Sequence, residues 1–229
     1  MPDCLQTQSL LIGVLALQGA FIEHRHAVER LGARSMEIRF KEQLELIDGL
    51  IIPGGESTCI DKLSREIANE LYSEITRLGA SGKLPIYGTC MGTIFLAKEI
   101  EGSNQSRLNL MDITVRRNAY GPQKSSFEAD LDISALNRGE GEGNNSFPGI
   151  FLRAPSILSV KDNVQVLCQF DGLAVMARQD NLLVTTFHPE ITDDLRIHKY
   201  FIDQICRNSK QSPMASITTF PYEVSLSKS

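Results

Sequence analysis

The first hundred residues alternate short apolar runs with segments of helical periodicity. The apolar runs cover residues 10–17, 35–40, 48–52 and 84–87, and the helical segments cover residues 21–31, 61–78 and 93–98. A continuous apolar run is typical of a strand that is buried on both faces of a parallel sheet. Strands that alternate with helices predict an α/β fold, with an open, mostly parallel sheet and helices on both faces.

The second half of the chain has shorter strand-like runs separated by turns. These runs cover residues 113–115, 126–131, 150–152, 164–170, 174–176 and 182–187, and a closing helix covers 195–208. We expect them to form an antiparallel extension of the sheet. The polar, glycine-rich stretch 137–148 is expected to be a surface loop.

A chain of 229 residues, 42% of them hydrophobic, can bury one substantial core. We therefore expect a single domain over 10–208, with flexible termini at 1–9 and 209–229, where the composition is polar. The net charge is −5. No basic cluster exceeds the Arg116-Arg117 pair, which argues against nucleic acid or an anionic membrane as the partner.

The cysteines and the N-terminus indicate the compartment. Five cysteines lie far apart, without a Cys-x-x-Cys pair, so neither a disulfide framework nor a zinc site is predicted. The apolar run that starts at Leu10 is too short for a signal peptide or a membrane span. We expect a cytoplasmic protein that uses no metal and no cofactor.

Cys90 stands at a predicted strand-to-helix corner, in the run Tyr87-Gly88-Thr89-Cys90-Met91-Gly92. Glycine on either side allows a strained turn that exposes the side chain. The start of the following helix favours thiolate over thiol, which lowers a cysteine pKa from its usual value of about 8.5. A lone cysteine in an apolar stretch is, however, more commonly a small buried hydrophobic residue, so Cys90 needs partners to be a nucleophile.

His188 and Glu190 supply such partners. They follow the predicted strand 182–187 and are two residues apart, so in extended backbone their side chains point the same way. A His-x-Glu triplet alone is common. In an open parallel sheet, however, the carboxyl ends of the strands carry the site, and both this triplet and Cys90 belong to such ends. Together they predict a Cys-His-Glu triad.

A nucleophile that attacks a carbonyl group also needs donors for the oxyanion. The backbone N–H of Gly55, in the turn after the strand 48–52, and that of Met91, at the start of the helix after Cys90, are suitable. Pro53-Gly54-Gly55 alone would be an ordinary turn. Its position at the same sheet edge as Cys90 favours the oxyanion interpretation.

These residues resemble the class I, triad-type glutamine amidotransferases, and among them the glutaminase subunits of pyridoxal 5'-phosphate synthase. The resemblance extends from residue 12 to about 207 in family order. It is carried by Gly13-Val14-Leu15-Ala16-Leu17-Gln18-Gly19, Pro53-Gly54-Gly55-Glu56-Ser57-Thr58, Gly88-Thr89-Cys90-Met91-Gly92, Arg117-Asn118-Ala119-Tyr120-Gly121 with Ser126-Phe127, Leu152-Arg153-Ala154-Pro155 and Phe187-His188-Pro189-Glu190.

The resemblance implies a flavodoxin-like three-layer fold and a glutaminase reaction. Cys90 would attack the side-chain amide of L-glutamine, His188 would act as base and then acid, and Glu190 would orient His188. The products would be glutamate and ammonia. The glutamine site would be formed by Gly55, Glu56, Ser57, Arg117, Leu152 and Arg153, with Gln18 near the oxyanion region and the partner interface.

The resemblance also implies a partner. Members of this family pass ammonia to a separate barrel-shaped synthase subunit that builds pyridoxal 5'-phosphate, or vitamin B6. Two positions depart from the family pattern: Met91 replaces a commoner alanine, and Pro122 stands where arginine is frequent. The stretch 137–148 and the tail beyond Ser209 have no family counterpart.

Three alternatives remain open at this point. One is the glutaminase subunit of another amidotransferase, such as imidazole glycerol phosphate synthase, which the Leu-Gln-Gly and Arg-Asn-x-Tyr-Gly stretches disfavour. The second is a catalytically silent regulatory homologue, which the presence of all three triad residue types disfavours. The third is a cysteine hydrolase or deglycase on a similar sheet, which is not expected to carry the His-Pro-Glu triplet.

Overall fold

The structure, a computed structural model, describes residues 9–55, 69–121, 126–137 and 146–211. Its first half contains β1 (Leu11–Leu15), α1 (Phe21–Arg30), β2 (Arg34–Ile38), the 3₁₀ helix Lys41–Leu46, β3 (Gly49–Ile52), α3 (Asn69–Ala80), β4 (Ile86–Thr89) and α4 (Met91–Leu96). This order matches the predicted alternation of strands and helices. The predicted helical residues 61–68, together with Glu56, Ser57 and Pro122, lie outside the described residues.

The second half is richer in strands. It contains β5 (Ala97–Ile100), β6 (Met111–Arg116), β7 (Ser126–Asp132), the 3₁₀ helix Ser134–Asn137, β8 (Ser146–Leu152), β9 (Ser156–Val160), β10 (Gln165–Phe170), β11 (Leu173–Gln179), β12 (Leu182–Thr185) and the 3₁₀ helix Pro189–Ile191. The closing helix consists of α5 (Arg196–Tyr200), the π-helical turn Phe201–Cys206 and α6 (Arg207–Gln211), and so extends three residues past its predicted end.

One large sheet organises the molecule. Its strand order is β2-β1-β3-β4-β12-β11-β9-β6-β5, with β10 added to β11. The strands from β2 to β12 pair in parallel, whereas β11 pairs antiparallel with β12, β9 and β10. A separate antiparallel ribbon joins β7 and β8. The predicted fold class, a mostly parallel sheet with an antiparallel extension, is confirmed.

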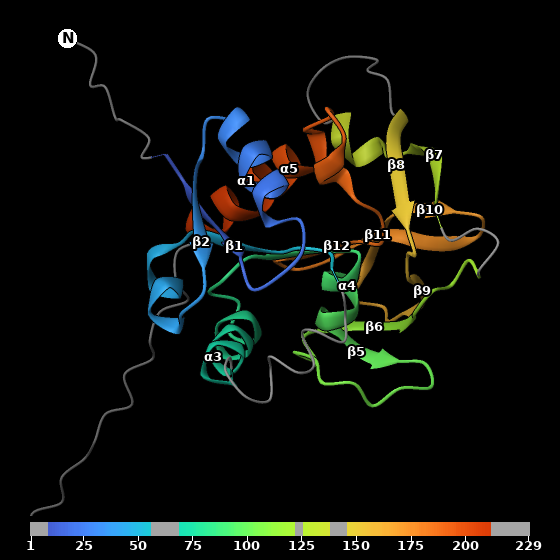
Figure 1. Cartoon of the computed structure of the whole chain (residues 1–229), viewed down its shortest axis with the longest axis horizontal. Coiled ribbons are helices and arrows are strands. Elements are labelled where there is room, and N and C mark those ends of the chain that lie inside the picture. Colours follow the sequence, from blue (N-terminus) through green and yellow to red (C-terminus); the bar gives the residue numbers. More distant parts are fainter. Residues whose placement is uncertain (1–8, 56–68, 122–125, 138–145, 212–229) are drawn as a thin grey trace, which may run out of the picture.

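Helices cover both faces of this sheet, as Figure 1 shows, with α1 and α5 on one side and α3 and α4 on the other. Every residue of β3 and β4 is buried. One core cluster contains Leu71 and Ile75 of α3, and the other contains Val28 of α1 and Ile197 of α5. The helices thus pack by their apolar faces, and the continuous apolar runs are the strands between two cores.

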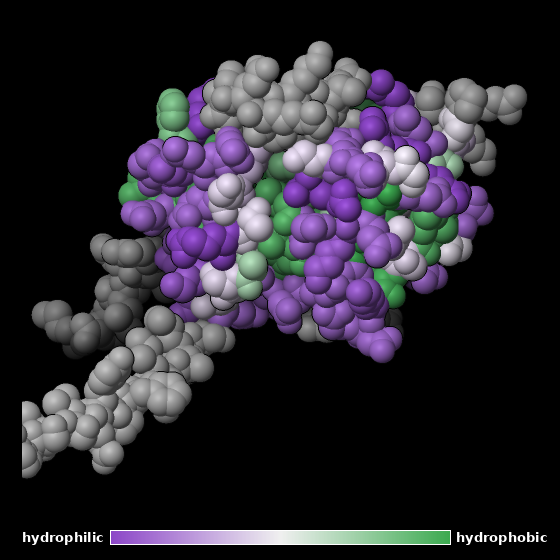
Figure 2. Space-filling view, turned by 90° about the horizontal axis from the view of Figure 1, so that it is seen from below, coloured by the Kyte–Doolittle hydropathy of each residue, from purple (hydrophilic) through white to green (hydrophobic). Residues whose placement is uncertain are grey.

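The face seen from below is mostly hydrophilic, with hydrophobic residues visible chiefly in hollows between polar ones (Figure 2). Within the part of the chain that the structure describes, no helix has the length and apolar character to span a membrane.

Three local predictions differ from the structure. The helix after Cys90 was expected to cover 93–98, but it ends at Leu96, and Ala97 begins β5 by pairing with Met111 of β6. β9 was not predicted; it is inserted between β6 and β11, a long-range pairing without a local signal. β8 begins at Ser146, inside the stretch predicted as loop, because the edge of a two-stranded ribbon tolerates Pro148.

Gly92, which follows the Cys90 corner, lies where there is no room for a side chain. A Cβ atom on Gly92 would lie 2.2 Å from the carbonyl oxygen of Ile52, a backbone atom of β3 that cannot retreat cheaply. We expect Gly92→Ala to lower the free energy of unfolding by about 1–3 kcal/mol, measured by urea denaturation. The control is Gly102→Asn, at an open position with φ of +66°. Asparagine tolerates this backbone, so the free energy of unfolding should change by about 0.5 kcal/mol or less. Equal losses would contradict this account.

Candidate active site

Cys90 lies at the carboxyl end of β4, immediately before α4. Its backbone has φ 48° and ψ −103°, a strained conformation for a residue with a side chain. The Cys90 N–H donates to the carbonyl oxygen of Thr185 on β12, at 2.7 Å, so a sheet hydrogen bond stabilises the strained residue. The strained corner is as expected from the sequence, but the side chain of Cys90 is buried, at 7% exposure, rather than exposed.

His188 and Glu190 follow β12, the strand beside β4. His188 Nδ1 lies 2.7 Å from Glu190 Oε1, and both residues are buried. Their relation is not the extended i, i+2 arrangement that we predicted, because Glu190 lies in the 3₁₀ helix Pro189–Ile191. The proline begins that turn, which curls the carboxylate back toward the imidazole.

Gly54 lies close to both Cys90 and His188. A Cβ atom on Gly54 would lie 2.6 Å from His188 Cε1 and 3.1 Å from Cys90 Cβ. The backbone of this turn therefore passes directly beside both side chains. Cys90 Sγ lies 3.9 Å from the carbonyl oxygen of Leu152, an acceptor for the thiol.

The electrostatics of His188 favour an imidazolium. Burial opposes its charged form, but the interactions with Cys90 and Glu190 outweigh burial and raise the pKa of His188 to about 10. Burial likewise opposes the charge on Glu190, yet the neighbouring histidines His24 and His188 leave the pKa of Glu190 below its ordinary value. At neutral pH the site thus holds an imidazolium between the cysteine and a carboxylate.

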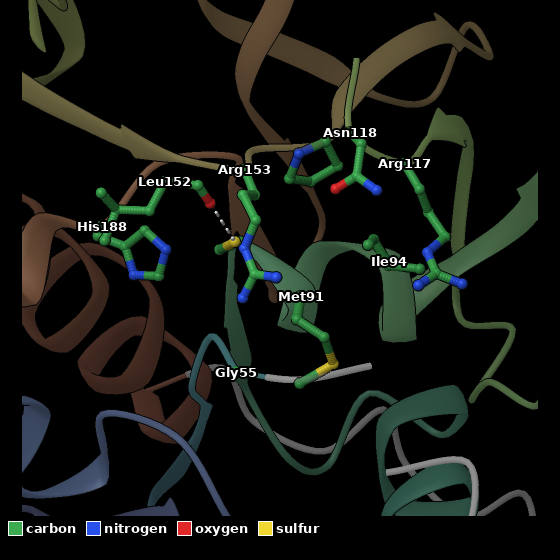
Figure 3. Close-up of a pocket in the computed structure, with 10 residues that line it drawn as sticks. Gly55, Met91, Ile94, Arg117, Asn118, Leu152, Arg153 and His188 are labelled. Atoms are coloured by element: carbon green, nitrogen blue, oxygen red, sulfur yellow. Dashed lines mark hydrogen bonds between the residues drawn. The ribbon is translucent and has the colours of Figure 1, made fainter. Parts of the chain in front are cut away.

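A cavity of about 290 Å³ opens over Cys90. Figure 3 shows the side chains around it. Its lining residues are Gly55, Cys90, Met91, Ile94, Arg117, Asn118, Leu152, Arg153, Pro155 and His188. The structure therefore brings Gly55, Met91, Arg117, Leu152 and Arg153 together with Cys90 and His188 as the sequence predicted.

The sequence prediction did not select Ile94, Asn118 and Pro155 as lining residues. Asn118 and Pro155 belong to the motifs that also contain Arg117 and Arg153, so a signal for them was present. Ile94 had none beyond its place on α4, one turn after Cys90.

Two loops that each contain a residue with a positive φ bring arginines to the cavity. Arg153 has φ +45° and Asn118, next to Arg117, has φ +47°. A left-handed backbone costs a residue such as Arg153 about 1–3 kcal/mol and is concentrated at functional sites, whereas asparagine tolerates it. Arg117 Nη1 donates to Gln105 Oε1 at 3.0 Å, which anchors the first arginine. The cavity therefore has two guanidinium groups near its wall, suited to a carboxylate ligand.

Gln18 packs over the glycine turn. A Cβ atom on Gly55 would lie 2.0 Å from Gln18 Oε1, and one on Gly19 (φ +84°) would lie 1.8 Å from the Gly54 carbonyl oxygen. The loop after β1 therefore lies against the turn after β3. Gln18 stands beside the predicted oxyanion region, as expected.

The raised pKa of His188 predicts how stability depends on pH. A group with a raised folded-state pKa contributes fully below its unfolded pKa of about 6.5, and this contribution is lost as pH rises toward 10. We expect the difference in unfolding free energy between the unmodified chain and His188→Asn to shrink steadily from pH 6 to pH 10. Urea denaturation at each pH measures this, and a constant difference would show that the folded-state pKa of His188 is not raised above its unfolded value.

Comparison with known proteins gives the family. Residues 14–207 match the model of the SNO glutamine amidotransferase family. The chain is 54% identical over 196 residues to a Carboxydothermus hydrogenoformans protein named "Pyridoxal 5'-phosphate synthase subunit PdxT", covering 86% of this chain and 98% of that relative. A Thermus thermophilus protein of the same name is 46% identical over 194 residues, with 84% and 96% covered.

Solved structures agree. A crystal structure described as a glutamine amidotransferase has a TM-score of 0.76 at 45% identity, covering 86% of this chain and 98% of the other. A putative GMP synthase subunit from Thermoplasma acidophilum, with a TM-score of 0.65 at 17% identity and 89% and 96% covered, shares the fold. The resemblance found in the sequence is confirmed, and the chain belongs to the SNO glutamine amidotransferase family.

Proposed function

We propose that this chain is a glutaminase that hydrolyses L-glutamine to L-glutamate and ammonia through Cys90, His188 and Glu190. The observation that carries the proposal is a cysteine on a strained corner, beside an imidazole that is itself hydrogen-bonded to a buried carboxylate, at the floor of an arginine-walled cavity. Membership of a glutamine amidotransferase family supports the choice of substrate.

The chemistry follows from these positions. The Cys90 thiolate attacks the side-chain amide carbon of glutamine, and the carbonyl oxygen becomes an oxyanion. The His188 imidazolium then gives its proton to the amide nitrogen, which leaves as ammonia, and a thioester on Cys90 remains. Neutral His188 next takes a proton from a water molecule, which attacks the thioester and releases glutamate. Glu190 holds the imidazole orientation through both steps.

The oxyanion donors in this proposal are the backbone N–H groups of Gly55 and Met91. Met91 begins α4, where N–H groups have no acceptor within the helix, and Gly55 lies on the cavity wall. The Met91 side chain is not required for the donation, so its departure from the family's alanine is compatible with activity. Gln18, packed over Gly55, supports the turn.

The substrate's charged end is assigned to the two arginines. Arg117 and Arg153 would hold the α-carboxylate, with the Leu152 backbone beside them. Gly55, Glu56 and Ser57 complete the proposed glutamine site, although Glu56 and Ser57 lie outside the described residues. A cavity of about 290 Å³ lies near the lower end of the usual range for small-molecule sites.

We further propose a synthase partner and a cytoplasmic location. The relatives from C. hydrogenoformans and T. thermophilus are named as subunits of pyridoxal 5'-phosphate synthase. This supports transfer of the ammonia to the barrel-shaped synthase subunit for vitamin B6 synthesis. A nucleophilic thiolate is preserved in a reducing compartment, because oxidising compartments favour disulfides.

The reaction is tested by glutamate release from glutamine, with and without the synthase subunit. We expect release to increase strongly when the synthase is added and to fall to background in Cys90→Ala, because Cys90 is the only cysteine among the described residues that line the cavity. Unchanged release in Cys90→Ala would contradict the mechanism. A stable complex that releases no glutamate would instead show that the chain is a silent regulatory homologue.

The role of Arg153 is tested by Arg153→Gln. A charge-assisted hydrogen bond contributes about 1.5–3 kcal/mol, so we expect KM for glutamine to rise roughly 10- to 100-fold with a smaller change in kcat. The matched control is Arg116→Gln. Arg116 is exposed and pairs with Glu101, with Nη2 at 2.9 Å from Oε1, so KM should not change. An unchanged KM in Arg153→Gln would remove Arg153 from the glutamine site.

A further inference from the structure

Behind the triad lies a row of buried polar groups that the mechanism above does not use. Glu190 Oε2, the oxygen that does not contact His188, lies 3.5 Å from His24 Nε2. His24 Nδ1 in turn lies 2.9 Å from His198 Nε2. His24 is on α1 and His198 is on α5, and both are fully buried. The two helices therefore place two imidazoles in line behind the carboxylate.

The tautomers of His24 and His198 are assigned from which of the neighbouring atoms can donate a hydrogen bond and which can only accept one. An ionised carboxylate only accepts, so we assign the proton of His24 to Nε2, which faces Glu190. Nδ1 of a neutral His24 is then an acceptor, and His198 must donate to it from Nε2. This assignment leaves His198 Nδ1 unprotonated, and that atom has no hydrogen-bond partner among the described residues.

The electrostatics keep both imidazoles neutral. Burial lowers the pKa of His24 despite the opposing influence of Glu190, and burial together with His24 lowers the pKa of His198 to about 3. His24 thus directs an N–H toward Glu190 Oε2, 3.5 Å away, without bringing a second positive charge, and this oxygen has no hydrogen-bond partner among the described residues. The negative charge of Glu190 remains available to the His188 imidazolium, since a cation at His24 would compete for it.

His24 also reaches the glycine turn. Its Nε2 lies 3.2 Å from Thr89 Oγ1, and Thr89 Oγ1 accepts the N–H of Gly54 at 3.0 Å. Thr89 immediately precedes Cys90, and Gly54 precedes Gly55, the proposed oxyanion donor. One imidazole therefore touches both the carboxylate that orients the base and the hydroxyl that holds the turn.

We propose that His24 is a positioning residue for the reaction, and that His198 holds it in the donating tautomer. His24 fixes the carboxylate of Glu190 in the orientation that aligns His188, and through Thr89 it links this alignment to the Gly54-Gly55 turn. The proposal rests on the glutaminase function proposed above.

Two other roles, core packing and metal binding, explain the buried His24 and His198 less well. An apolar side chain would fill the space of His198 without leaving a buried nitrogen unpaired, which costs free energy. In the described part of the chain, no group of three or more His, Cys, Asp or Glu side chains could hold a metal ion.

Four titratable side chains among the described residues lie around Glu190. His188 directly precedes the 3₁₀ helix of Glu190, His24 is on α1 and His198 is on α5. The fourth is the buried Tyr87 on β4, whose hydroxyl bonds to Thr185.

Two amide variants give the sharpest test. The amide nitrogen of glutamine can occupy the place of His24 Nε2, whereas asparagine reaches only the place of Nδ1, beside His198. In the complex with the synthase subunit, we expect His24→Asn to lower kcat roughly 10- to 100-fold with KM changed less than threefold, because misalignment of a catalytic group has effects of this size. His24→Gln should recover most of kcat. His26→Gln, at an exposed histidine on the same helix, is the matched control and should match the unmodified chain.

A second measurement does not need glutamine turnover. The rate at which iodoacetamide alkylates Cys90 at pH 7 reports how well His188 supports the thiolate, and it should fall several-fold in His24→Asn but not in His24→Gln. Equal rates in all variants, or equal kcat losses in the Asn and Gln variants, would overturn the proposal and leave packing as the role of His24. If the unmodified complex releases no glutamate but the alkylation rates differ as expected, the positioning role stands and the glutaminase function fails.

Discussion

The hydrogen bond between the Cys90 N–H and the Thr185 carbonyl oxygen is the contact on which the site depends. Cys90 has a backbone conformation that an isolated chain would avoid, and parallel pairing of β4 with β12 holds it there. The same pairing brings His188, which follows β12, to the same sheet edge as Cys90. Nucleophile and base are thus aligned by one pair of neighbouring strands that are distant in sequence.

A buried carboxylate is the second constraint. Glu190 is costly to bury as an anion, and the structure stabilises it with an imidazolium on one oxygen and a neutral imidazole N–H near the other. This arrangement orients His188 and leaves Glu190 its negative charge, which stabilises the His188 imidazolium. Helices α1 and α5 therefore contribute to the chemistry as well as to the core.

Much of the site could be predicted from sequence, for identifiable reasons. Cys90, Gly55 and His188 follow predicted strands, and the carboxyl ends of parallel strands meet at one edge whatever the details of packing. Arg117 and Arg153 came from motif resemblance. His24 and His198 gave no signal, because a histidine inside an amphipathic helix has the same local pattern whether it faces a core or a carboxylate. The end of α4 at Leu96 was also missed, since Ala97 has a strand partner on β6 that no local pattern reveals.

The sequence by itself determined the alternation of strands and helices, the glycine-flanked corner and the residue types of the triad, because these depend on local periodicity and backbone preference. The tertiary structure alone decided which strands are neighbours, and hence that β12, the last strand in the described part of the chain, lies beside β4. It also decided that Glu190 reaches His188 by a 3₁₀ turn and that two histidines 174 residues apart lie in contact behind it. Such contacts arise from packing of the whole domain around the sheet, which no single segment encodes.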